Sequence, residues 1–80
     1  MFVEIYTPEK KIFTGEVKLI KLPGSKGSFE ILENHAPIIS SLDRGTIKLI
    51  DASGKVLNFD ISGGVIENKA NKTVVLVETD

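Results

Sequence analysis

The chain has 80 residues, 41% of them hydrophobic, no cysteine and a net charge of -1, so it can form one domain with one core and has no disulfide framework. Its ten basic and eleven acidic residues are scattered, which argues against binding to nucleic acid or to an anionic membrane surface. No segment approaches the ~20 apolar residues of a membrane-spanning helix, and the first residues lack the pattern of a signal peptide, so composition alone predicts a cytosolic protein.

The apolar residues recur mostly at every second position, which predicts strands rather than helices. Val3 and Ile5 lie in a first short strand that ends at Thr7-Pro8. A longer strand covers Ile12 to Leu22, and its inward positions change from odd to even numbers after Leu19. Such a change of phase predicts a β-bulge, or a strand that passes from one sheet to the other.

Glycine and proline mark the next turns. Pro23 to Gly27 predicts a turn, and it lacks the spacing and the following helix of a phosphate-binding loop. Short strands follow at Ser28 to Leu32 and at Ile38 to Leu42, separated by Asn34-His35-Ala36-Pro37.

The second half of the chain predicts four more strands: Thr46 to Ile50, Lys55 to Ile61, Val65 to Glu67 and Thr73 to Val77. Gly54 supplies the positive φ that the turn after the first of them needs, and Ser62-Gly63-Gly64 predicts a bulge or a close approach of two backbones. The apolar run at Val74 to Val77 predicts a strand covered on both faces. About eight short strands in this arrangement predict a sandwich or a barrel.

One group of residues is more apolar than half-buried strands need: Ile20, Leu22, Ile38, Ile39 and Leu42. Either both faces of these strands are internal, or the group forms an apolar patch that docks onto another protein. The pattern alone leaves both interpretations open.

Few residues could carry chemistry. One histidine and no cysteine exclude zinc sites of the usual spacing. A Ser-His-Asp set could be composed from Ser40 or Ser41, His35 and Asp43, but nothing in the spacing requires it and no Gly-x-Ser-x-Gly motif is present. We expect the His35 ring to bond within its own turn or to lie at an interface. With no Trp and one Tyr, an aromatic sugar-binding platform is not expected.

A resemblance to a known family extends over the whole chain. The segment from Gly27 to Ile39, GSFEILENHAPII, resembles the ATP synthase epsilon-subunit pattern Gly-x-Leu-Gly-Ile-x-Pro-Gly-His-Ala-Pro followed by two aliphatic residues. Thr7 to Gly15 resembles the family's second-strand region, and Leu42 to Gly45 its aliphatic-x-Pro-Gly turn. Ile61 to Glu67 resembles its Ser-Gly-Gly motif, and Thr73 to Val77 its closing strand.

The resemblance implies an all-β fold, with one domain over residues 1–80 formed by a flattened sandwich of two five-stranded, mostly antiparallel sheets. It implies a non-catalytic rotor subunit in the central stalk of a proton-translocating F-type ATP synthase, which couples rotation of the c-ring to the gamma subunit. It also implies peripheral association, through the complex and without insertion, with the cytoplasmic side of a bacterial plasma membrane. No cofactor and no metal are expected.

Carried over by position, the resemblance implies two contact regions. The residues expected to contact the gamma subunit are His35, Ala36, Pro37, Ile38, Ile39, Ser40 and Leu42. The residues expected to contact the c-ring are Gly24, Ser25, Lys26, Gly27 and Ser28. The chain departs from the family at Phe29-Glu30, Glu33-Asn34 and Arg44, where Leu-Gly, Pro-Gly and Pro are usual, and these departures affect the loops rather than the order of strands.

Typical members continue into two helices after the last strand, whereas this sequence ends at Glu78-Thr79-Asp80. We therefore expect a form without a C-terminal helical hairpin, an inhibitory arm or an ATP site. Two other hypotheses stay open: a free-standing β-sandwich adaptor or ligand-binding module, and a small hydrolase centred on His35.

Overall fold

The computed structural model describes residues 1–80, and its regular elements are all strands. The eight predicted strands are confirmed: β1 (Phe2–Tyr6), β2 (Lys11–Leu22), β3 (Phe29–Leu32), β4 (Ile38–Leu42), β5 (Gly45–Asp51), β6 (Val56–Ile61), β7 (Gly63–Lys69) and β8 (Lys72–Glu78). The structure contains no helix that is long and apolar enough to cross a membrane.

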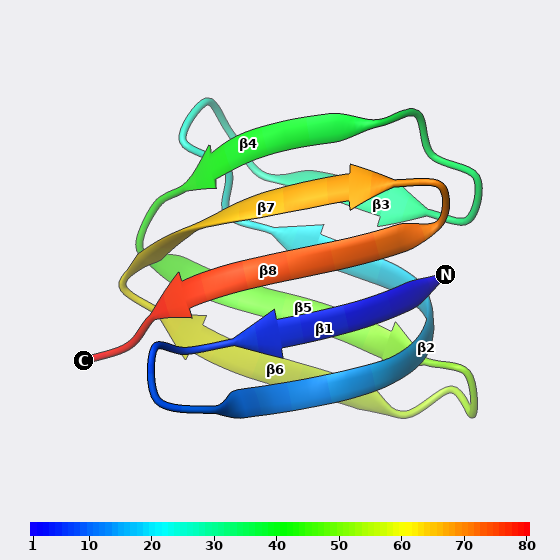
Figure 1. Ribbon diagram of the computed structural model, residues 1–80, viewed down its shortest axis with the longest axis horizontal. Coiled ribbons are helices and arrows are strands. Elements are labelled where there is room, and N and C mark those ends of the chain that lie inside the picture. The colour runs from blue at the N-terminus through cyan, green and yellow to red at the C-terminus, as the bar shows by residue number, and fades with distance from the viewer.

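The strands form two layers (Figure 1). The front sheet has the order β4-β7-β8-β1-β2, and the back sheet consists of β3, β2, β5 and β6. Every pairing is antiparallel except that of β1 with β8, which is parallel. The all-β sandwich is confirmed. The expected count of five strands in each sheet is not, because the back sheet has four and β2 belongs to both sheets.

Strand β2 passes from one sheet to the other. It pairs with β1 as far as Glu16 and with β5 from Val17 onward, and the register with β5 shifts between Val17 and Leu19. The buried positions change accordingly, from Val17 to Ile20 and Leu22. The predicted change of phase is thereby confirmed, since one extra residue in a strand reverses the side to which the later side chains point.

The core lies between the two sheets and contains 14 buried apolar side chains. Phe13, Phe29 and Phe59 pack against it, and the rings of Phe13 and Phe59 meet edge to face with centroids 6.1 Å apart. Of the five surplus apolar residues, three are fully internal: Ile20, Leu22 and Leu42. The interpretation of these three as a docking patch is wrong, because they fill the interior of the sandwich.

Two glycines have the conformational roles that the sequence predicts. Gly54 has a φ of 92° in the turn between β5 and β6. A Cβ atom at Gly64 would lie 2.4 Å from the carbonyl oxygen of Leu76, so the close approach of two backbones at the Ser-Gly-Gly motif is confirmed.

Candidate functional site

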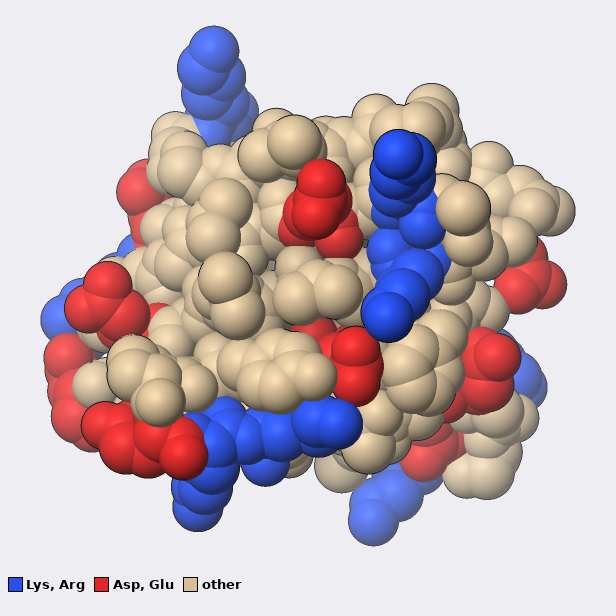
Figure 2. Space-filling view, in the orientation of Figure 1, with Lys and Arg blue, Asp and Glu red and all other residues tan.

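The outward face of the front sheet has no second layer over it. Six large apolar side chains of the protein are exposed, and four of them lie on this face: Phe2, Ile39, Val65 and Leu76. Figure 2 shows the face, with an uncharged area to the left of its middle and acidic and basic side chains around that area. A concentration of exposed apolar groups on one sheet face is typical of a protein–protein contact surface.

Strand β8 contributes most clearly to this face. Val75 and Val77 are buried, but Leu76 between them is 52% exposed. The prediction that the run from Val74 to Val77 is covered on both faces is therefore wrong. Alternation along the strand turns its even-numbered residues outward, where the chain itself provides nothing to cover them.

Three side chains on neighbouring strands form the middle of the apolar surface. In the registers of the sheet, Leu76 lies opposite Val65 on one side and opposite Tyr6 on the other. An open depression of about 480 Å³ adjoins them, lined also by Thr7, Pro8, Gly64, Val77 and Glu78. Because its walls come from three strands and one turn, its shape is fixed by the hydrogen bonds of the sheet.

A small group of charges borders this surface and holds Tyr6 in place. The Lys11 ammonium lies 3.2 Å from Glu4 Oε2 and 5.5 Å from the centre of the Tyr6 ring, whose hydroxyl donates to Glu4 Oε2 at 3.1 Å. Lys72 Nζ lies 3.8 Å from Glu4 Oε1. The hydrogen bond from Lys11 lowers the pKa of the Glu4 carboxyl below its usual value, with further contributions from Tyr6 and Lys72. An aromatic side chain fixed in this way loses little freedom when a partner covers it.

The loop that carries His35, Ala36 and Pro37 joins β3 to β4 and is exposed. Its histidine Nδ1 lies 2.7 Å from the carbonyl oxygen of Ala36, so the expected bond within its own turn is confirmed. Asn68 is buried, and its amide donates to the carbonyl oxygens of His35 and Ala36, both at 3.4 Å. The Thr73 hydroxyl in turn donates to Asn68 Oδ1 at 2.8 Å, which fixes the amide toward the loop.

A pair of asparagines anchors the start of the same loop. The Asn34 backbone N–H donates to Asn71 Oδ1 at 2.6 Å, and the Asn71 amide donates to Asn34 Oδ1 at 2.8 Å. Both residues have positive φ angles, 63° and 60°, which asparagine tolerates better than most residues. The loop is thus attached to the turn between β7 and β8.

The Ser-His-Asp set composed from the sequence is not assembled. No hydrogen bond joins His35 to Ser40, Ser41 or Asp43. Ser40 donates to the Ser41 carbonyl oxygen instead, and Ser41 donates to Ser25.

The residues expected to face the gamma subunit divide into three groups. His35 to Pro37 are exposed in the loop, and Ile39 is 72% exposed on the front face. Ile38 and Ser40 are half-buried, and Leu42 is 4% exposed. Leu42 therefore offers almost no surface to a partner.

The residues expected to face the c-ring, Gly24 to Ser28, form the turn between β2 and β3. Gly24 pairs with Leu42 in an isolated bridge, and the Ser25 N–H donates to the Ser41 carbonyl oxygen at 3.1 Å. An open depression of about 420 Å³ between this loop and β4 is lined by members of both sets, Ser25, Lys26, Gly27, Ile38, Ile39 and Ser40, together with Phe29 and Ser41. The structure thus brings the two expected contact regions together.

Reasoning from the sequence missed Tyr6, Val65 and Leu76, the middle of the apolar surface. The signal was present in the run from Val74 to Val77, which has two more apolar side chains than one inward face requires. It also missed Asn68. The segment from Asn68 to Lys72 has the polar composition of a turn, although Asn68 itself is a buried residue of β7.

Comparisons with known proteins agree on one family. Residues 1–79 match the family described as ATP synthase, delta/epsilon chain, beta-sandwich domain. The ATP synthase epsilon chain of Bordetella petrii is 38% identical over 77 residues, which are 96% of this chain and 55% of the relative. The epsilon chain of Chlorobaculum tepidum is 36% identical over 76 residues, which are 95% of this chain and 86% of the relative. The chain spans about half the length of most of the curated relatives that it matches.

Two solved structures have the same fold. A chain of the Euglena gracilis mitochondrial ATP synthase, in a structure of its OSCP, F1 and c-ring parts, superposes with a TM-score of 0.82 at 23% identity and covers 96% of this chain and 48% of its own. A chain from a structure of the central stalk and c-ring of the Tetrahymena thermophila mitochondrial ATP synthase superposes with a TM-score of 0.79 at 21% identity. The superposition covers 98% of this chain and 63% of the Tetrahymena chain. These likenesses establish a shared β-sandwich.

Proposed function

The chain belongs to the family of ATP synthase delta/epsilon-chain β-sandwich domains, and from this premise we propose that it is a non-catalytic rotor subunit of an F-type ATP synthase. In this role it joins the c-ring to the gamma subunit in the central stalk, so that rotation of the ring drives ATP synthesis. The proposal is supported by its relatives, which are ATP synthase epsilon chains, and by its structural neighbours, which are parts of ATP synthase complexes that contain the c-ring.

The observation that carries the proposal is the uncovered apolar face of the front sheet. Leu76, Val65 and Tyr6 lie side by side there, and Ile39 lies on the adjoining edge strand. We assign this face to the gamma subunit. The gamma-facing surface is then wider than the segment from His35 to Leu42 and is centred on β7, β8 and β1.

The loop from Gly24 to Ser28 is assigned to the c-ring. It projects from one end of the sandwich beside β4 (Figure 1), and its Lys26 side chain is exposed. In this arrangement the protein contacts the membrane only through the ring, on the cytoplasmic side of a bacterial plasma membrane.

The construction of the sandwich suits a part that transmits torque. Strand β2 is hydrogen-bonded into both sheets, so a force on one sheet acts on the other through a continuous backbone. A close-packed interior deforms little under load. No bound nucleotide and no chemical step are needed for this role.

The test is a binding experiment with the 80-residue chain, purified gamma subunit and purified c-ring in detergent. We expect the chain to form a stable complex with gamma, and the ring to be retained on that complex. Absence of any gamma binding would overturn the proposal and favour the free-standing β-sandwich adaptor.

A further inference from the structure

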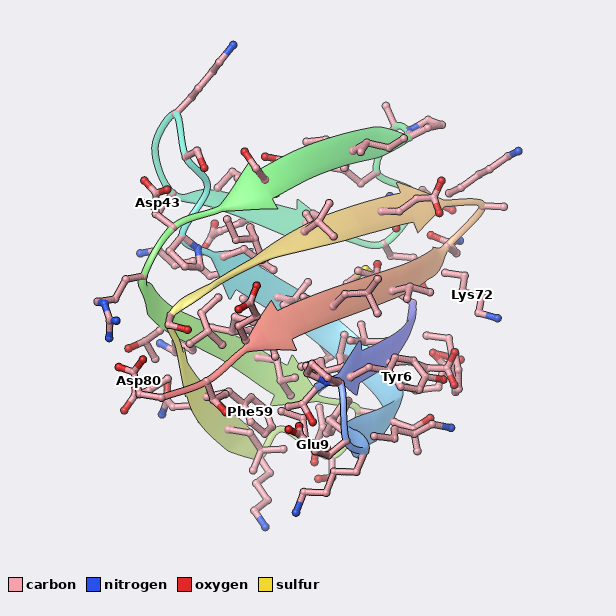
Figure 3. The ribbon with its side chains drawn as sticks, turned by 60° about the vertical axis from the view of Figure 1, so that its left-hand side comes forward. Tyr6, Glu9, Asp43, Phe59, Lys72 and Asp80 are labelled. Carbon is pink, nitrogen blue, oxygen red and sulfur yellow. The ribbon has the colours of Figure 1, made fainter.

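A network of three exposed side chains connects the loop Gly24–Ser28 to the end of β4. The Ser41 hydroxyl donates to the Ser25 hydroxyl oxygen at 2.9 Å, and the Ser25 hydroxyl donates to Asp43 Oδ1 at 3.0 Å. We call these three residues the serine–aspartate network. Asp43 lies immediately after β4, beside the loop (Figure 3).

Backbone hydrogen bonds reinforce the same connection. The Ser25 N–H donates to the Ser41 carbonyl oxygen at 3.1 Å, and the Asp43 N–H donates to the Pro23 carbonyl oxygen at 2.8 Å. Two glycines permit this close approach. A Cβ atom at Gly24 would lie 2.7 Å from the Phe29 ring, and one at Gly45 would lie 2.8 Å from Pro23 Cβ.

The serine–aspartate network is not needed to satisfy buried polar groups. All three of its side chains are exposed, so no buried polar group requires these partners. The neighbouring Arg44 is paired with Asp80, which leaves the Asp43 carboxylate to Ser25. The consequence of the network is local: the loop is held in one position relative to β4.

We propose that Ser25, Ser41 and Asp43 are positioning residues that preset the loop Gly24–Ser28 for its contact with the c-ring. This inference rests on the proposed function, and it adds a role for Asp43, which lies outside both expected contact regions. A loop that is already ordered binds more tightly than a mobile one, because less conformational freedom is lost on contact. The network also connects the loop directly to β4, the edge strand of the sheet assigned to gamma.

The test compares Asp43→Ala, Asp43→Asn and a matched control, Ser53→Ala. Asp43→Ala removes the acceptor of the Ser25 hydroxyl, whereas Asp43→Asn keeps an oxygen there and removes only the charge. Ser53 donates to Asp51 Oδ1 at 2.7 Å in the turn at the far end of β5, so Ser53→Ala deletes an equivalent exposed hydroxyl–carboxylate bond away from the loop. Neither Asp43 nor Ser53 is buried, so the three variants are expected to fold.

Two measurements are made on each variant. Amide hydrogen exchange in the free chain reports how well the loop is ordered. The affinity of each variant's complex with gamma for purified c-ring reports how much the loop contributes to ring binding. For Asp43→Ala we expect protection of the Ser25 amide and affinity for the ring each to fall by about two- to tenfold, the range of one exposed hydrogen bond. Asp43→Asn and Ser53→Ala are expected to stay within about twofold of the unmodified chain.

The outcomes separate this inference from the proposed function. If Asp43→Ala leaves exchange or ring affinity unchanged, or if Asp43→Asn weakens ring binding as much as Asp43→Ala does, the inference is overturned and the rotor role stands. If the unmodified chain binds gamma but no ring, the proposed function fails and the inference fails with it.

Discussion

Replacement of Leu76 by aspartate tests the assignment of the front face most directly. Leu76 is 52% exposed in the free protein, so about half of its side chain remains to be covered by a partner. Full burial of a leucine contributes about 1.5–3 kcal/mol, and the uncovered half therefore contributes about 1 kcal/mol to docking. Leu76→Ala is accordingly expected to raise the Kd for gamma by about fivefold.

Leu76→Asp has a larger expected effect. It places an unpaired carboxylate in an apolar contact, which costs roughly 3 kcal/mol or more, so the Kd is expected to rise at least about 100-fold. The free protein tolerates the change, since the side chain can remain in water. Its thermal midpoint should stay within about 3 °C of the unmodified chain, as is usual for a substitution at an exposed position.

Val56 provides the matched control. It is 49% exposed and lies in β6 of the back sheet, which we do not assign to gamma. Calorimetric titration of purified gamma into Leu76→Asp and Val56→Asp compares equal new charges on opposite sheets. Wild-type affinity in a folded Leu76→Asp protein, or an equal loss in Val56→Asp, would show that the front face is not the docking surface.

Three further predictions concern the sandwich itself. Gly64→Ala should lower the free energy of unfolding by about 2–3 kcal/mol in urea denaturation, because the added Cβ atom would clash with the backbone of β8. The control Gly63→Ala, whose added Cβ atom would make only ordinary contacts, should lower it by less than about 1 kcal/mol. Equal losses in the two variants would contradict the close approach of the backbones. Asn68→Ala should lower the free energy of unfolding by about 2–3 kcal/mol, since it leaves the buried Thr73 hydroxyl without its acceptor and removes two hydrogen bonds to the loop carbonyls. It should also increase amide exchange in the His35 loop, and unchanged exchange there would refute the anchoring role. The lowered pKa of Glu4 contributes stability above the carboxyl's unfolded pKa, and this contribution is lost as the pH falls through the folded pKa. Lys11→Met should therefore raise the Glu4 midpoint in an NMR titration of its carboxyl carbon, and an unmoved midpoint would exclude Lys11 as the main cause.

The strands were predictable because a single physical signal, alternation of apolar and polar residues, governs most of them. Val3 and Ile5 point inward as expected, and the change of phase in β2 is readable because one added residue reverses the alternation. The glycines at 54 and 64 were predictable for the same kind of reason. Each removes a local steric conflict that the neighbouring sequence already indicates.

The uncovered apolar face of the front sheet was harder to predict, since its exposure depends on what lies above the sheet rather than on the strand itself. The run at Val74 to Val77 has the same composition whether a second layer covers it or a partner does. Only the structure shows that no part of this chain covers Leu76. Likewise, no local pattern connects Ser25 with Asp43, because their contact depends on how the β2–β3 turn packs against the end of β4.

The parallel pairing of β1 with β8 has a consequence for how the protein forms during synthesis. These two strands are neighbours in the front sheet, although Phe2 pairs with Lys72 across most of the chain's length. A nascent chain can form the hairpin of β1 and β2 early, but β1 cannot pair with β8 until that strand has left the ribosome. Strand pairing over so long a separation is slow, and until then one edge of β1 is open to misdirected pairing with other chains.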